Sequence, residues 1–278
     1  KALQIIENHQ DQTLKIEDLA CTVGVSARHL RRTFFDHLGV SPMQLIKTRR
    51  VQLAKKLIGE TPLAMSQIAM VAGFPNTRQF NTEIRNSYNK TPTELRRGQS
   101  FKDHSSLLLK LAYRPPLDWQ QIENYMQLRL MDGVESFSDG TFQRVLKLDD
   151  TIGVIEVKND PAKNVLKIKV PSAFWRHIPD ILSRVRTLFD LNSDSAALEK
   201  SLGQDKYLRS LVARQNGMRV LGCWNFFELT VRTIIGQQVS VAGAATVNRR
   251  LIERAGEAIP ASIREANEHW PAEITTLY

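Results

Sequence analysis

The chain has 278 residues, of which 42% are hydrophobic, so it is long enough for two or three domains with packed cores. No apolar run approaches the ~20 residues that a membrane span needs, which argues against a membrane protein, and we expect no membrane partner. Two distant cysteines, Cys21 and Cys223, match neither a disulfide framework nor a zinc site. They favour a reducing cytoplasm, and we expect no metal and no cofactor. The opening KALQIIENHQ lacks a Met and a signal-peptide pattern, so we expect a further segment before Lys1.

Positive charge is concentrated in the first third of the chain. Residues 1–105 contain 16 Lys and Arg against 9 Asp and Glu, a net charge of +7, whereas the remaining residues contain 22 against 20. Such an excess is typical of a nucleic-acid surface, and a merely basic solvated face is the alternative. The first third is therefore the expected DNA-contacting region.

An internal repeat occupies the first hundred residues. Residues 19–45 (LACTVGVSARHLRRTFFDHLGVSPMQL) align with residues 68–95 (IAMVAGFPNTRQFNTEIRNSYNKTPTEL). The offset is 49 at Gly24 and Gly73 and 50 from there to Pro42 and Pro92, so one residue is inserted after the glycine, where a turn tolerates it. Each copy predicts a short helix, a glycine turn with positive φ and a second helix.

Helical spacing predicts which side chains each copy buries. In the second helix of the first copy, Leu30, Phe34 and Leu38 fall on one face. In the second copy Phe80 and Ile84 take that role. The side chains expected to lie off these buried positions are Arg28, Arg31 and Arg32 in the first copy and Thr77, Arg78, Asn81 and Thr82 in the second.

Local chemistry predicts how the copies begin, end and connect. Cys21 is expected to be a small core residue of the first helix. Each copy ends in a Ser-Pro or Thr-Pro pair with Gln44 or Glu94 following, which is a helix-capping pattern. Residues 45–58 are expected to form one helix that joins the copies.

Two such units in tandem form a double helix-turn-helix, which is a DNA-binding arrangement. We expect the second helix of each unit, here called its reader, to enter the major groove, with the two entry points ~34 Å apart in successive grooves. Arginine bonds guanine edges with two hydrogen bonds, and Asn does the same for adenine. A phosphate contact or a free surface charge is the alternative for each arginine. The candidate DNA-binding residues are Arg28, Arg31, Arg32, Thr77, Arg78, Asn81 and Thr82.

The second copy carries a family resemblance. The run GFPNTRQF…NKTPTELRR after IAMVA resembles the second signature of AraC/XylS-type transcription regulators, whose DNA-binding domain residues 1–97 would cover. That family usually has an arginine at Thr82 and an aromatic residue at Ile84. The resemblance implies a sequence-specific reader, and these departures concern what the second unit reads rather than its fold.

After residue 100 the pattern changes to strands and then to helices. Strands are expected at 106–113, 143–148, 153–158 and 165–170, with helices at 118–130 and 174–188, so this segment is a small α+β domain with three or four antiparallel strands. From Ser193 onward the pattern is helical, at 194–202, 205–214, 225–237 and 240–254. The expected fold class is mainly α with an α+β middle domain, divided as 1–100, 105–190 and 191–278.

A second resemblance covers residues 107–256. LAYRPPLDW, GVESF, LFDLNSD and GMRVLGCWNFFELTVRTIIGQQVSV are similar to the AlkA-type DNA-3-methyladenine glycosylases. The resemblance implies that Gln238 is the wedge that enters the DNA when a damaged base leaves the stack, that Gly236 permits the close turn, and that Tyr125 is an aromatic wall of the base pocket. A helix cap for Gln238 and a core position for Tyr125 are the alternatives.

The same family cleaves the glycosidic bond with a G-x-G hairpin followed by an aspartate. In this chain the last glycine is Gly256 and the last aspartate is Asp205, so no catalytic residue is assigned. The order of the two resemblances is similar to Ada/AlkA fusion proteins, although the methyl-acceptor cysteines of that group are absent from the chain. We expect a transcription regulator of the alkylation-damage response carrying a truncated, helical glycosylase module without the hairpin. The alternative is a bifunctional regulator and glycosylase whose catalytic segment follows Tyr278.

The expected partner is double-stranded DNA, either a promoter site or damaged DNA. RNA polymerase is a further candidate partner. The expected location is the bacterial cytoplasm, in association with the nucleoid.

Overall fold

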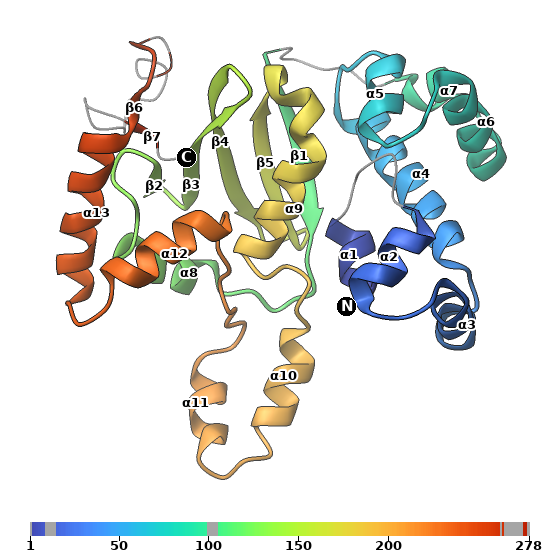
Figure 1. Cartoon of the computed structure of the whole chain (residues 1–278). Helices are drawn as coiled ribbons and strands as arrows, with labels where there is room; N and C mark the ends of the chain where they lie inside the picture. The colour runs from blue at the N-terminus through green and yellow to red at the C-terminus, as the bar shows by residue number, and fades with distance from the viewer. Residues whose placement is uncertain (1, 9–14, 99–104, 262, 264–274, 277–278) are drawn as a thin grey trace. The chain divides into compact units, whose positions relative to one another are not determined.

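The structure, a computed structural model, describes the chain except for residues 1, 9–14, 99–104, 262, 264–274 and 277–278 (Figure 1). It divides into two compact units, Lys1–Leu107 with Ser172–Ser183, and Leu108–Pro171 with Arg184–Tyr278. The expected fold class is confirmed, because helices dominate both ends of the chain and one antiparallel sheet lies in its middle. The division into three domains stays a prediction.

The first unit contains two helix pairs connected by a long helix, as the repeat predicts (Figure 1). The connecting helix, α4, is longer than expected because Pro42 begins it and Thr61 caps its end. The helices are α1 (Ala2–Asn8), α2 (Ile16–Val23), α3 (Ala27–Leu38), α4 (Pro42–Glu60), α5 (Met65–Val71), α6 (Thr77–Tyr88) and α7 (Pro92–Arg96).

The glycine turns have the same backbone in both copies. Gly24 has φ +81° and Gly73 has φ +80°. In each copy the residue after the glycine returns its N–H to a carbonyl of the preceding helix, from Val25 to Ala20 (3.0 Å) and from Phe74 to Ala69 (2.9 Å). A residue with a side chain is strained at such φ, which explains why glycine occupies both turns.

Two expectations about burial in the first copy are wrong. Leu30 and Phe34 are buried, but Leu38 is 44% exposed, because it is the last residue of α3 and lies at the edge of the apolar stripe. Cys21 is exposed as well. The buried face of α2 is formed by Ile16, Leu19 and Ala20. Cys21 follows Ala20 and is therefore rotated about 100° around the helix axis, towards solvent.

The main sheet has five strands rather than three or four. Their order is β1-β5-β4-β3-β2, with β2 to β5 antiparallel. The strand that the sequence does not predict is β2. Its four residues, ESFS, are too few to show a strand pattern, and only the pairing with β3, for example of Glu135 with Arg144, identifies it. The strands are β1 (Ser106–Ala112), β2 (Glu135–Ser138), β3 (Thr141–Leu148), β4 (Thr151–Asp160) and β5 (Val165–Pro171).

An aromatic cluster packs on this sheet. Trp119, Phe137, Phe142 and Phe189 have neighbouring ring centroids 5.1–5.9 Å apart, in tilted and edge-on contacts. The indole N–H of Trp119 donates to the carbonyl of Gly140 at 2.8 Å, so its one polar atom is satisfied. The cluster fixes the start of α8, the helix that carries Tyr125.

The remaining helices follow the sequence pattern with shifted ends. The expected helix at 174–188 is divided into a 3₁₀ turn and an α-helix. The expectation of helices alone after Ser193 is wrong, because Glu257–Ala258 (β6) pairs with Thr275–Thr276 (β7). The helical elements are α8 (Trp119–Gln127), η1 (Ser172–His177), α9 (Ile178–Leu188), α10 (Ser195–Leu202), α11 (Leu208–Arg214), α12 (Phe226–Ile235) and α13 (Val241–Ala255).

Among the residues that the structure describes, no helix is long and apolar enough to cross a lipid bilayer.

Candidate nucleic-acid interface

The outer face of α3 presents three of the predicted residues. Ser26 begins the helix by accepting a hydrogen bond from the His29 N–H at 3.2 Å. Arg28, Arg31 and Arg32 are all exposed on the turns that follow. Arg31 lies 3.3 Å from Glu17 of α2, but both side chains are more than half exposed, so this ion pair is weak and leaves Arg31 available.

The outer face of α6 presents the other four. Asn76 begins this helix by accepting a hydrogen bond from the Gln79 N–H at 2.8 Å. Thr77, Arg78, Asn81 and Thr82 are all exposed. The Thr82 hydroxyl donates to the Arg78 carbonyl at 3.0 Å. The structure therefore gathers the predicted residues into two sets, one on each second helix, and their contacts with DNA stay a prediction.

The connecting helix holds the second reader through polar and aromatic contacts. Lys47 of α4 pairs with Glu83 of α6 at 2.8 Å, and Lys55 lies over the Tyr88 ring, 4.5 Å from its centroid. A Cβ added at Gly73 would lie 3.2 Å from Nε of Arg50. A side chain at position 73 would therefore be strained by its φ and would also require the Arg50 side chain to shift by a few tenths of an ångström. Burial lowers the pKa of Arg50, which stays a cation at neutral pH.

In the second unit, Tyr125 lies on the exposed side of α8. Its side chain is 50% exposed, so the alternative of a core position is not what the structure shows. The Arg129 guanidinium covers one face of the ring, with its carbon 3.9 Å from the centroid, and donates to the Tyr125 carbonyl at 3.1 Å. An arginine already stacked on this ring changes which bases the ring can accept, because a cationic base would have to displace it.

Gln238 occupies the short break between α12 and α13. Its φ is +59°, a left-handed conformation that is uncommon for a residue with a side chain, and it is exposed. Ser240 begins α13 by accepting a hydrogen bond from the Gly243 N–H at 3.1 Å, so the cap is Ser240 rather than either glutamine. Strain of this kind is more often found at functional sites than elsewhere, and the wedge role of Gln238 stays a prediction.

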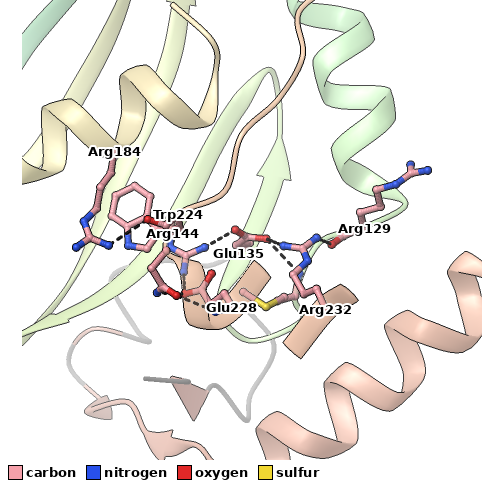
Figure 2. Close-up of polar contacts among 9 residues, drawn as sticks. Arg129, Glu135, Arg144, Arg184, Trp224, Glu228 and Arg232 are labelled. Carbon is pink, nitrogen blue, oxygen red and sulfur yellow. Dashed lines mark hydrogen bonds and ion pairs between the residues drawn. The ribbon is translucent and has the colours of Figure 1, made fainter. Parts of the chain in front are cut away.

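A buried ion network connects the sheet to the helix that leads to Gln238 (Figure 2). Arg144 of β3 is 2% exposed and donates to Glu135 of β2 and to Glu228 of α12. Arg232, one turn after Glu228, lies 3.6 Å from Glu135 and donates to the carbonyl of Arg129. Tyr125, Arg129 and the end of α12 are thereby linked through named polar contacts.

Sequence reasoning missed this network. The spacing of Glu228 and Arg232 by four residues is the one signal that the sequence offers, and it predicts an exposed pair on one helix. The partners Glu135 and Arg144 lie more than 80 residues earlier and are brought close only by the sheet register.

The pKa of the Glu228 carboxyl group is raised above its ordinary value. Burial raises its pKa, the nearby charge of Glu135 raises it further, and the Arg144 guanidinium acts in the opposite direction. The Asn225 amide donates to the same carboxylate at 3.0 Å.

A hollow of about 200 Å³ lies between the end of α8 and the two helices that flank Gln238. Arg129 and Arg232 line one part of it, and Gly236, Val239 and small residues of α13 line the rest. Within the described part of the chain, no group of three or more His, Cys, Asp or Glu residues is placed to hold a metal ion.

Comparisons with known families agree with this organisation. A helix-turn-helix domain family matches residues 19–98, and the AlkA N-terminal domain family matches residues 108–225. The first match covers both helix pairs, and the second covers the sheet together with α8 to α11.

Similar proteins combine or separate the same parts. A probable bifunctional transcriptional activator/DNA repair enzyme AlkA from Mycobacterium tuberculosis is 28% identical over 265 residues, which are 93% of this chain and 53% of the relative. The DNA-3-methyladenine glycosylase 2 of Escherichia coli is 31% identical over 147 residues, which are 53% of this chain and 50% of the relative. The chain thus spans about half the length of these relatives.

Among solved structures, a transcriptional regulator with an AraC-type DNA-binding domain from Chromobacterium violaceum is 31% identical, over 37% of this chain and 91% of that one, with a TM-score of 0.34. The chain joins a helix-turn-helix domain of the AraC type to an AlkA N-terminal domain.

Proposed function

We propose that this chain is a sequence-specific DNA-binding transcription regulator of the response to alkylation damage, and that its AlkA-like part adds contacts to damaged DNA. The observation that carries the proposal is the pair of matched second helices, α3 and α6, whose outer faces are exposed and rich in arginine and amide side chains. An α-helix fits the major groove, where such side chains distinguish base pairs.

The charge distribution supports the same assignment. The net charge of +7 in residues 1–105 attracts the phosphate backbone, which supplies affinity without sequence preference. Preference then depends on the few side chains that reach base edges, for which Arg28 and Arg32 on α3 and Arg78 on α6 are the leading candidates.

The test is in vitro selection of a binding site from random duplexes, followed by Arg32→Ala. We expect wild type to select a defined site and Arg32→Ala to lose preference at one or two positions, by about 1–3 kcal/mol for each base pair. Arg254→Ala, an exposed arginine on α13, is the matched control and should keep the selected sequence. Failure of wild type to prefer any duplex contradicts the proposal, and a loss of affinity that is even across sequences assigns Arg32 to phosphate.

A bifunctional regulator and glycosylase is the second candidate. The names of the M. tuberculosis and E. coli relatives favour it. So does the hollow lined by Arg129, which covers the Tyr125 ring, and by Gly236 and Val239, which precede and follow the glutamine pair. Because the catalytic segment of this candidate would follow Tyr278, the test uses the product of the complete gene, incubated with DNA that contains 3-methyladenine. Rapid release of the free base supports the enzyme, whereas binding without release supports the regulator.

We infer that the partners are double-stranded promoter DNA and damaged DNA, with RNA polymerase as the protein that a bound activator contacts. The site of action is the nucleoid in the bacterial cytoplasm. Crosslinking in cells, followed by recovery of DNA and of polymerase subunits, tests these partners.

A further inference from the structure

Phe35 is an exposed aromatic residue on the cationic face of α3. Its side chain is 65% exposed, whereas Leu30 and Phe34 on the other side of the same helix are buried. Leaving a phenylalanine ring in water forfeits about 1.5–3 kcal/mol of burial free energy. Phe35 therefore contributes nothing comparable to the core of the first unit.

Helical geometry places Phe35 among the candidate DNA-binding arginines. It follows Arg28 by seven residues, Arg31 by four and Arg32 by three, and residues at these spacings lie on one helix face. All three arginines are exposed on that face. The ring is thus set between cations that attract a phosphate backbone and bond base edges.

The repeat provides an internal comparison. At the offset of 50 residues, Arg28 corresponds to Arg78 and Phe35 corresponds to Arg85, which is exposed on α6. The second copy thus has a charged group where the first has an apolar ring. The two readers differ at this position in the kind of group that they can contact.

We propose that Phe35 contacts the 5-methyl group of a thymine in the DNA site read by α3, and so specifies T·A at one position. The inference rests on the proposed DNA-binding function. In the major groove the thymine methyl is the apolar group that base edges present, and phenylalanine is among the side chains that contact it. The arginines around Phe35 are complementary in charge to DNA. An apolar protein surface would offer these arginines no partners, so DNA fits this face of α3 better than such a surface does.

The experiment removes the methyl group from the DNA and the ring from the protein. After a site has been selected with the full chain, each thymine is replaced in turn by deoxyuridine, which keeps the base pairing and lacks the methyl. Burying one methyl is worth about 0.8 kcal/mol, so wild type should bind about fourfold more weakly when one particular thymine is replaced.

The variant Phe35→Ala should bind the thymine and deoxyuridine sites equally, which makes a double-mutant cycle with the methyl group. Phe35→Arg, which copies the second repeat, should raise affinity for all duplexes and still not distinguish the two bases. Met43→Ala removes another exposed apolar side chain of the same unit and should leave the fourfold ratio unchanged.

The outcomes separate this inference from the proposed function. If wild type selects no site, the proposed function fails. If wild type selects a site but no thymine shows a methyl effect that depends on Phe35, the inference alone is overturned. Loss of self-association in Phe35→Ala with an unchanged thymine effect would likewise overturn it, because the ring would then serve a protein contact.

Discussion

Replacing Arg144 by Met is the sharpest test of the ion network in the second unit. The Arg144 side chain is 2% exposed, and the two carboxylates that it bonds, Glu135 and Glu228, are 3% and 5% exposed. The Met side chain fills most of the volume but leaves both carboxylates without their shared cation. Glu135 retains Arg232 at 3.6 Å, and Glu228 retains the Asn225 amide.

Breaking a buried pair in this way typically costs 3–5 kcal/mol, so we expect Arg144→Met to lower the free energy of unfolding of this unit by about 4 kcal/mol. Urea titration followed by tryptophan emission measures it, because the Trp224 ring lies 4.8 Å from the Arg144 guanidinium and reports on this region. Adding Glu228→Leu to Arg144→Met should recover part of the loss, since the stranded charge is then removed. A loss below about 1 kcal/mol for Arg144→Met would refute the reasoning, because the network would then not be buried as described.

Three further outcomes are expected. Gly73→Ala should cost more stability than Gly24→Ala in thermal unfolding, because both have φ near +80° but only at Gly73 would the new Cβ meet Arg50, at 3.2 Å; equal losses would contradict the close approach. Thr91→Ala should cost about 1 kcal/mol by removing the capping box that begins α7, and Thr91→Ser should restore most of it. Because burial raises the pKa of Glu228, its contribution favours folding below the unfolded-state pKa and is lost as pH rises through the folded-state value. The difference in unfolding free energy between Glu228→Gln and wild type should therefore shift in favour of the variant with rising pH, and a difference that is constant from pH 4 to 8 would contradict this.

The parts of the fold that the sequence predicts well depend on local chemistry. Gly24 and Gly73 are marked by the repeat, and both turns have the expected positive φ. The cap at Thr91 is predicted from Thr91 and Glu94, which are three residues apart, and the structure has both hydrogen bonds of this capping box. These features are recoverable because the interacting groups are neighbours along the chain.

The expectations that failed depend on contacts between distant segments or on the ends of elements. The sequence predicts Cys21 and Leu38 in the core, but Cys21 lies one residue beyond the buried face of its helix and Leu38 is the last residue of α3, so both are exposed. The strand Glu135–Ser138 is too short to be recognised without its partner β3. For the candidate site, the sequence indicates Tyr125 and Gln238 through a family resemblance, but it does not indicate that Arg129 covers the tyrosine ring.

The position of Gln238 also depends on contacts between segments that are distant in the sequence. Helix α12 ends at Ile235, three residues before Gln238, and its Glu228 and Arg232 face the sheet one helical turn apart. Because each bonds a charged residue on β2 or β3, the helix cannot rotate or slide along the sheet without stranding a buried charge. A buried network of this kind adds little net stability compared with apolar packing, but it specifies one register. The residue proposed to enter DNA is therefore held in place by charges that belong to the sheet, and a change at Arg144 should disturb the Gln238 segment while leaving the helix-turn-helix unit folded.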